Sequence, residues 1–129
     1  MVEITFILYL HFVADFIFQS EYMATNKSAN NLALLNHVIV YSLVWGLGLL
    51  IYFINELDIN KVYNIMIFTW VTLVAHFITD YITSRIVKKK FDKGEYGSDI
   101  PNFGGFTVIG FDQLLHYIQL LLTWEILFK

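Results

Sequence analysis

The sequence predicts an all-α integral membrane protein built as a four-helix bundle. Hydrophobic residues make up 57% of the 129 residues, and charged residues make up only 15%. A soluble domain usually carries about 25% charged residues, so this chain has too few to cover a surface that faces water. Four apolar windows are each long enough to cross a bilayer, which takes roughly 20 residues. We therefore expect residues 1–129 to form a single transmembrane domain.

The boundaries of the four helices follow from the polar stretches between the apolar windows. The predicted helices are Ile4–Tyr22, Leu32–Ile54, Val62–Ile86 and Phe106–Phe128. The predicted connections are Ala24–Asn31, Asn55–Lys61 and Val87–Gly105. Strands are not expected, because the apolar runs are too long and do not alternate. The alternative is a soluble bundle of buried helices, but its surface would then expose large apolar patches to water.

The first window is predicted to be a retained helix and not a secretory signal. Glu3 stands where a signal has basic residues, and Asp15 and Gln19 interrupt the apolar run. A small-residue cleavage site is also missing. The chain has no cysteine, which excludes disulfide, zinc–thiolate and iron–sulfur chemistry.

The distribution of cations predicts the orientation of the chain in the membrane. The cations near the first and third connections are Lys27, Arg85, Lys88, Lys89, Lys90 and Lys93. Only Lys61 and Lys129 lie on the opposite side. Because cytoplasmic loops are enriched in Lys and Arg, both of these connections should face the cytoplasm. We expect a protein of the bacterial cytoplasmic (inner) membrane with both termini outside.

Each predicted helix carries one histidine, and three of the histidines have an aspartate four residues away. The pairs are His11 with Asp15, His76 with Asp80, and Asp112 with His116, while His37 stands alone. Residues four apart share one face of a helix. With a rise of about 1.5 Å per residue, the aspartates lie about 10 Å and the paired histidines about 15 Å from the cytoplasmic ends. The reversed order on the last helix is what one shared layer in an antiparallel bundle requires.

These seven residues predict a binding site for a divalent transition metal, Zn, Mn or Fe, as one or two ions. Ionisable side chains inside a membrane are costly and are normally kept for a function. A cation offsets the cost of three buried carboxylates, and imidazole with carboxylate ligands favours these metals over Mg or Ca. A buried polar network or a proton path is the alternative. The chain lacks H-E-x-x-H and E-x-x-H, which disfavours a zincin or a ferritin-like site.

Four further polar residues are candidates for binding substrate. Gln19 and Gln113 stand near the metal layer, where they could contact substrate or orient a ligand. Lys27 and Arg85 lie on the same side and could hold a phosphate headgroup. Alternatively, the only role of Lys27 and Arg85 is to set the orientation of the chain in the membrane, and this explains both cations equally well.

The motifs around these residues resemble those of a known family of small phage and bacterial membrane proteins of unknown function. They are His11-Phe-Val-Ala-Asp15-Phe-Ile-Phe-Gln19, Asn26-Lys27-Ser28, His37, His76-Phe-Ile-Thr-Asp80-Tyr and Asp112-Gln113-Leu-Leu-His116. The resemblance covers nearly the whole chain. More distantly, the intramembrane His and Asp residues are similar to those of membrane-bound metal-dependent hydrolases.

Our leading hypothesis from the sequence is a metal-dependent hydrolase that acts at the inner leaflet on a phosphate-bearing lipid or lipid-linked substrate. The metal would activate water, and Asp15 or Asp112 would serve as the catalytic base. One alternative is a metal-ion or proton carrier, and another is a non-enzymatic phage-type membrane factor with a structural metal. The expected partner is membrane lipid, with a homo-oligomer left open and no nucleic acid.

Overall fold

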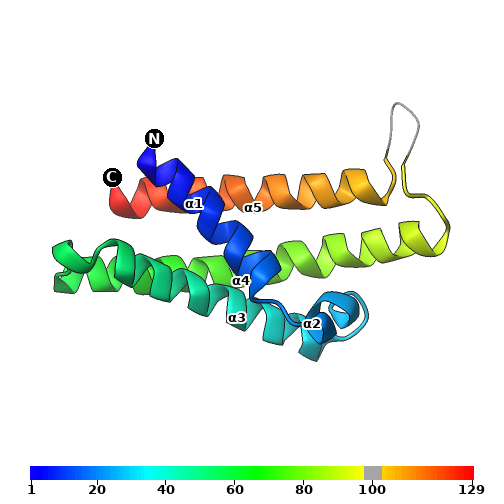
Figure 1. The fold of residues 1–129 in the computed structure, drawn as a ribbon, viewed down its shortest axis with the longest axis horizontal. Coiled ribbons are helices and arrows are strands. Elements are labelled where there is room, and N and C mark those ends of the chain that lie inside the picture. The colour runs from blue at the N-terminus through cyan, green and yellow to red at the C-terminus, as the bar shows by residue number, and fades with distance from the viewer. Residues whose placement is uncertain (98–102) are drawn as a thin grey trace.

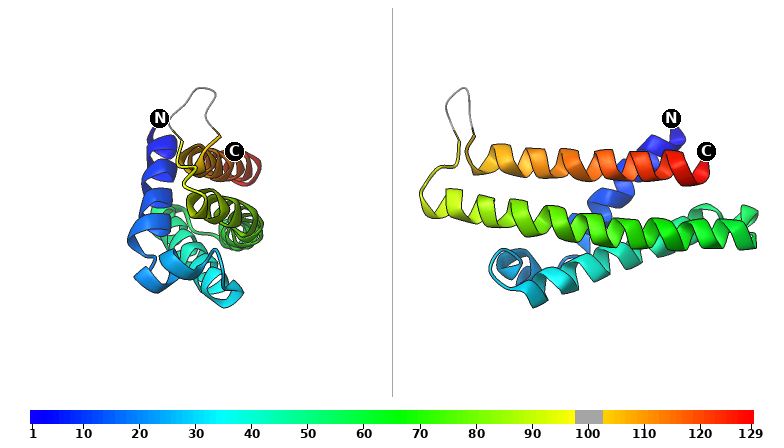
Figure 2. Two further views of the ribbon diagram at one scale, coloured as in Figure 1. Left: turned by 90° about the vertical axis from the view of Figure 1, so that its right-hand side faces the viewer. Right: turned by 180° about the vertical axis from the view of Figure 1, so that it is seen from behind.

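The computed structural model describes residues 1–97 and 103–129, and these residues contain helices and no strand. The elements are α1 (Val2–Phe12), the π-helix η1 (Val13–Ile17), α2 (Glu21–Asn26), α3 (Asn31–Tyr52), the 3-10 helix η2 (Ile54–Glu56), α4 (Ile59–Asp92) and α5 (Gly105–Phe128). Helices α4 and α5 form an antiparallel pair, and α1 runs diagonally across the bundle (Figure 1). Viewed along the long axis, α3, α4 and α5 are stacked and α1 lies beside the stack (Figure 2).

Aromatic side chains fill the half of the bundle that lies near the two termini. Trp45 from α3, Phe68 from α4 and Trp124 from α5 are all 3% exposed or less. The rings of Trp45 and Phe68 lie 5.3 Å apart between their centres. The buried histidines and aspartates lie farther from the two termini along these helices.

The outer faces of the long helices are strongly apolar. On α3, Leu43, Leu47 and Ile51 are 58%, 61% and 70% exposed, and on α4 Trp70 is 66% exposed. Helices α3 and α4 are long and apolar enough to cross a membrane. That α1 and α5 also span the bilayer, as the predicted four-helix membrane bundle requires, stays a prediction.

The first predicted helix, Ile4–Tyr22, is wrong at its end. The helical segment stops at Ile17, and a separate helix, α2, begins at Glu21. Ser20 starts this second helix, because its hydroxyl accepts a hydrogen bond from the backbone N–H of Met23 at 3.3 Å. Serine at this position satisfies a backbone donor that the first turn leaves open. The first three residues of the predicted first connection, 24–26, therefore belong to a short helix.

Helix α4, which corresponds to the third predicted helix, extends beyond the predicted window Val62–Ile86 at both ends. Asp58 caps the start of α4 by accepting a hydrogen bond from the backbone N–H of Lys61 at 2.6 Å. At the other end the helix continues to Asp92, which pairs with Lys88 at 2.9 Å. The first six residues of the predicted third connection, 87–92, are thus helical, and its residues 98–102 lie outside the described residues.

The ends of α4 and α5 are joined by backbone hydrogen bonds. The N–H of Gly105 donates to the carbonyl of Glu95 at 2.8 Å, and the N–H of Phe106 donates to that of Tyr96 at 3.1 Å. Gly97 has a φ of 107°, a conformation that favours glycine. These contacts hold the α4–α5 pair together at the end that extends beyond α3 (Figures 1 and 2).

Candidate metal centre

Four histidines and three aspartates from five elements meet inside the bundle. They are His11 from α1, Asp15 from η1, His37 from α3, His76 and Asp80 from α4, and Asp112 and His116 from α5. All of them except Asp112 are 3% exposed or less. The side chain of Asp112 is 14% exposed. The structure therefore brings together every residue that the sequence assigned to the metal site.

One group of three, Asp15, His37 and His76, could hold a metal ion. The Nε2 atom of His37 lies 3.1 Å from Asp15 Oδ1 and 3.1 Å from His76 Nε2. The Nε2 atom of His76 lies 3.7 Å from the same Asp15 oxygen. Asp15 Oδ1 is buried and accepts no well-directed hydrogen bond from the described residues. A buried carboxylate oxygen in this position is costly unless a cation neutralises it.

A second group, His76, Asp80 and His116, could also hold an ion. Asp80 Oδ1 lies 3.1 Å from His116 Nε2 and 3.7 Å from His76 Nε2. Asp112 approaches the same place, with its Oδ2 atom 3.4 Å from His116 Nε2. The two groups therefore lie side by side and share His76.

The spacing of these atoms fits metal coordination. A tetrahedral ion with bonds of about 2.0–2.1 Å requires ligand atoms about 3.3–3.4 Å apart. The five separations given above run from 3.1 to 3.7 Å and lie on both sides of that value. The Nε2 atom of His76 has one lone pair and binds one ion at a time. Two ions together would need Asp112 to replace His76 in the second group.

The π-helix η1 places Asp15 in the site. The N–H of Phe18 donates to the carbonyl five residues earlier, that of Val13, at 3.0 Å. Asp15 lies within this turn, and both Asp15 and His11 are buried, with His11 Nε2 3.9 Å from Asp15 Oδ2. Single π-helical turns inside helices are often found at functional sites. The sequence pattern did not indicate this turn.

Gln113 connects His11 to two of the carboxylates. Its amide nitrogen donates to Asp15 Oδ2 and to Asp112 Oδ2, both at 3.1 Å. Its amide oxygen lies 2.8 Å from His11 Nε2, and the hydroxyl of Tyr41 lies 2.7 Å from His11 Nδ1. Both ring nitrogens of His11 thus have hydrogen-bonding partners, and His11 belongs to neither three-residue group. That His11 ligates a metal stays a prediction.

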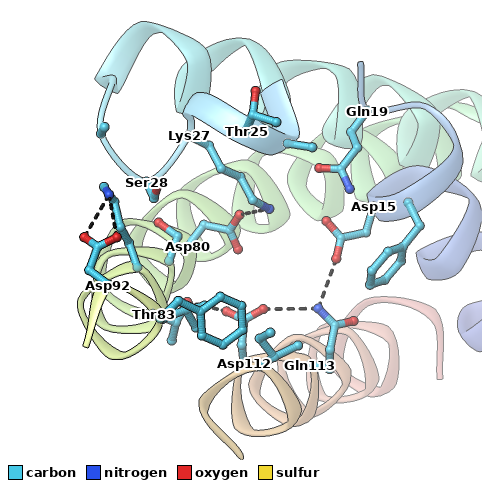
Figure 3. Close-up of a pocket in the computed structure, with 18 residues that line it drawn as sticks. Asp15, Gln19, Thr25, Lys27, Ser28, Asp80, Thr83, Asp92, Asp112 and Gln113 are labelled. Carbon is cyan, nitrogen blue, oxygen red and sulfur yellow. Dashed lines mark hydrogen bonds and ion pairs between the residues drawn. The ribbon is translucent and has the colours of Figure 1, made fainter. Parts of the chain in front are cut away.

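A pocket of about 480 Å³ lies next to the His and Asp residues. Its polar side is formed by Asp15, Gln19, Thr25, Lys27, Ser28, Asp80, Thr83, Ser84, Lys88, Asp92, Asp112 and Gln113. Its remaining walls include Phe16, Val87, Phe91 and Ile109. Figure 3 shows Lys27, Asp80, Asp15, Asp112 and Gln113 surrounding this space. A molecule with one polar and one apolar part would fit such a lining.

The four residues predicted to bind substrate have different surroundings. Gln19, Lys27 and Gln113 line the pocket. Arg85 is not among the pocket residues, and its guanidinium donates to Asn31 Oδ1 at 2.6 Å and to the carbonyl of Tyr81 at 2.8 Å. Arg85 therefore ties α4 to the start of α3, and its role in binding substrate stays a prediction.

Sequence reasoning gave no role at the site to Tyr41 and Thr83, which both contact it. The ring of Tyr41 stacks on that of His76 with 3.9 Å between the centres. Thr83 donates a hydrogen bond to Asp112 Oδ1. Tyr41 lies four residues after His37, and Thr83 lies three residues after Asp80. Their positions on the same helix faces as site residues were the available signal.

Comparison with known proteins gives a family but no activity. No curated protein and no solved structure matches this chain. A family model matches residues 4–129, and its description names no reaction and no ligand. The resemblance to a family of unknown function is thereby confirmed, whereas phage origin and the likeness to hydrolases stay predictions. The chain belongs to the family described as "Protein of unknown function (DUF3307)".

Proposed function

We propose that this protein is a membrane-embedded, metal-dependent hydrolase. The observation that carries the proposal is the position of two adjoining His and Asp groups at the polar side of one pocket. A metal site with only a structural role is usually closed by its protein ligands, whereas a catalytic one keeps a position open for water or substrate. Here Asp15 and Asp80 belong to the metal-binding groups and also line the pocket.

The proposed substrate is a phosphate-bearing lipid or lipid-linked molecule. Lys27 offers a positive charge at the polar side of the pocket, and Phe16, Phe91 and Ile109 offer apolar contact. The apolar outer faces of the helices and the two candidate spans support a location in the membrane. The pocket also includes Lys88, near the end of α4 where the predicted cytoplasmic cations gather. We therefore place the reaction at the inner leaflet of the bacterial cytoplasmic membrane.

Each polar residue near the metal has a proposed role in the reaction. A bound Zn, Mn or Fe ion would supply a hydroxide nucleophile near neutral pH and polarise the phosphoryl group. Asp112 is the proposed general base, because it lines the pocket and is the most exposed of the three aspartates. Thr83 and Gln113 both donate hydrogen bonds to it and hold its orientation. Asp15 directs one oxygen to the first metal group and accepts from Gln113 with the other.

Two measurements test this proposal. Elemental analysis of protein purified in detergent without chelators should find Zn, Mn or Fe in a fixed ratio to the chain. Mass spectrometry of lipids from cells that produce the protein should show a substrate consumed by the wild type and retained with Asp112→Asn. Glu125→Gln is the matched control, since it makes the same change at the exposed end of the same helix. The hydrolase proposal would be overturned if the purified protein contained no metal. It would also be overturned if the lipids were identical in cells with the wild type, Asp112→Asn and Glu125→Gln.

A metal-ion or proton carrier is the second candidate, and one observation favours it. Polar side chains continue past the histidines between α4 and α5, where the amide of Gln119 donates to Thr72 at 3.3 Å and to Thr123 at 3.1 Å. Thr72 is fully buried. A transport path needs such groups in the outer half of the bundle, and the sequence had indicated few of them there. Metal-dependent flux into vesicles containing the protein, without lipid cleavage, would support this candidate.

A further inference from the structure

We propose that Lys27 occupies the metal centre as a resident cation, and that metal binding releases it into the pocket to hold the phosphate of the substrate. This inference rests on the metal centre of the proposed function. Lys27 lies between α2 and α3, outside the predicted spans. It reaches across the bundle to His37 and Asp80, which belong to different metal-binding groups.

The contacts of Lys27 are those that a metal would need. Its Nζ atom lies 2.8 Å from Asp80 Oδ2 and 3.3 Å from His37 Nε2. An ammonium group has only N–H donors. In the tautomer with its proton on Nδ1, His37 presents the Nε2 lone pair to Lys27, and this is the lone pair with which it would bind an ion. Lysine and metal compete for one acceptor.

The charge of Lys27 is maintained in this position. Asp80 Oδ2 lies 2.8 Å from the Nζ atom of Lys27, and this carboxylate stabilises the ammonium form. A divalent ion bound to His37 would lie within a few ångströms of this ammonium, and like charges at that distance repel one another. The two cations therefore exclude each other from the centre.

The pocket provides the place to which Lys27 can move. About 20% of its side chain is already exposed, and Lys27 lines the pocket beside Ser28 and Thr25. While Lys27 is paired with Asp80, the pair as a whole has no net charge to attract an anion. Once a metal neutralises Asp80, Lys27 becomes available to a phosphate group. The metal thus prepares the pocket for an anionic substrate, and metal and phosphate should bind with positive coupling.

Zinc affinity tests the first half of the proposal. Competition with a chromophoric chelator measures zinc binding to detergent-purified wild type, Lys27→Met and Lys27→Arg. Loss of the competing charge in Lys27→Met should tighten zinc binding by about tenfold or more, which is the value of one hydrogen bond to a charged group. Lys27→Arg keeps the charge and should stay near the wild type. Lys89→Met removes a charge from α4 outside the pocket and should also bind zinc like the wild type.

Phosphate binding tests the second half. The proteins are loaded with zinc, freed of unbound zinc by desalting, and titrated with inorganic phosphate or with phosphatidic acid in mixed micelles. Zinc-loaded wild type should bind phosphate, and zinc-loaded Lys27→Met should bind it at least about tenfold more weakly. Tighter binding of phosphatidic acid would identify a lipid headgroup as the source of the phosphate. Equal binding would identify free phosphate, and both results support the release of Lys27.

The exchange of Lys27 for metal and the metal centre itself can be contradicted by different results. Zinc binding that is equal or weaker in Lys27→Met overturns the exchange and leaves the metal centre intact. Phosphate binding that does not change between zinc-loaded wild type and Lys27→Met also overturns it. Absence of zinc binding in every protein, with helix content intact by circular dichroism, overturns the metal centre of the proposed function itself.

Discussion

At the scale of single residues, Gln113 supports the site by satisfying three partners. Its amide binds Asp15, Asp112 and His11. Gln113→Leu removes two donors from carboxylates and one acceptor from an imidazole, so we expect it to lower the free energy of unfolding by about 1–3 kcal/mol. Unfolding titrations in detergent measure this loss. Gln119→Leu on the same helix is the comparison, because its side chain donates to neutral hydroxyls. An equal loss in both variants would contradict the role of Gln113.

His76 is the residue on which both metal-binding groups depend. We expect His76→Gln to weaken zinc binding by more than the roughly 10–100-fold that is typical for residues outside the ligand shell. His37→Gln and His116→Gln each remove a residue from one group only, and should weaken it less. Chelator competition ranks the three variants. Zinc affinity in His76→Gln at or above that of the other two would show that the groups do not share this ligand.

At the scale of elements, the junction of α4 and α5 depends on close packing at Gly105. A methyl group at this position would collide with the ring of Phe91 on α4. We therefore expect Gly105→Ala to lower the free energy of unfolding by about 1–3 kcal/mol, as overpacking does.

Gly110, in the same helix, provides the control. A methyl group there would meet nothing within 4 Å. Gly110→Ala should raise stability by about 0.5–1 kcal/mol, because alanine loses less backbone freedom than glycine in a helix. Thermal unfolding of both variants, followed by circular dichroism, gives the comparison. A stable Gly105→Ala variant would mean that the two helices separate easily at this end.

At the scale of the whole molecule, the length of α4 bears on how the protein sits in a membrane. Its 34 residues correspond to about 51 Å, which exceeds the roughly 30 Å hydrocarbon core of a bilayer. Part of the helix must then project from the membrane or tilt within it. The end that carries Lys88, Lys89 and Lys90 also extends beyond α3 (Figure 1). This arrangement favours projection of that end into the cytoplasm.

Labelling of single cysteines tests this orientation, since the chain has none of its own. Glu56→Cys in η2 should react with an impermeant thiol reagent in intact cells. Lys89→Cys should react only after the membrane is opened. The physical basis is the excess of cations on one side. Labelling of Lys89→Cys from outside would reverse the orientation and move the proposed reaction to the outer leaflet.

The sequence by itself determined which residue types were available and which helix faces they share. Spacing of four put Asp15 with His11, Asp80 with His76, and Asp112 with His116. Apolar windows predicted the long helices, and the last was placed almost to the residue. Boundaries were wrong at Ser20 and Asp58, where a capping side chain outweighs hydropathy.

Only the tertiary structure decided which of these side chains touch across helices. Periodicity gives the direction of a side chain from its own helix, but the neighbours it meets depend on the crossing and rotation of the other helices. The sharing of His76, the bridging by Gln113 and the pairing of Lys27 with Asp80 are all contacts of this kind. They join residues far apart in the chain, and no local pattern encodes them.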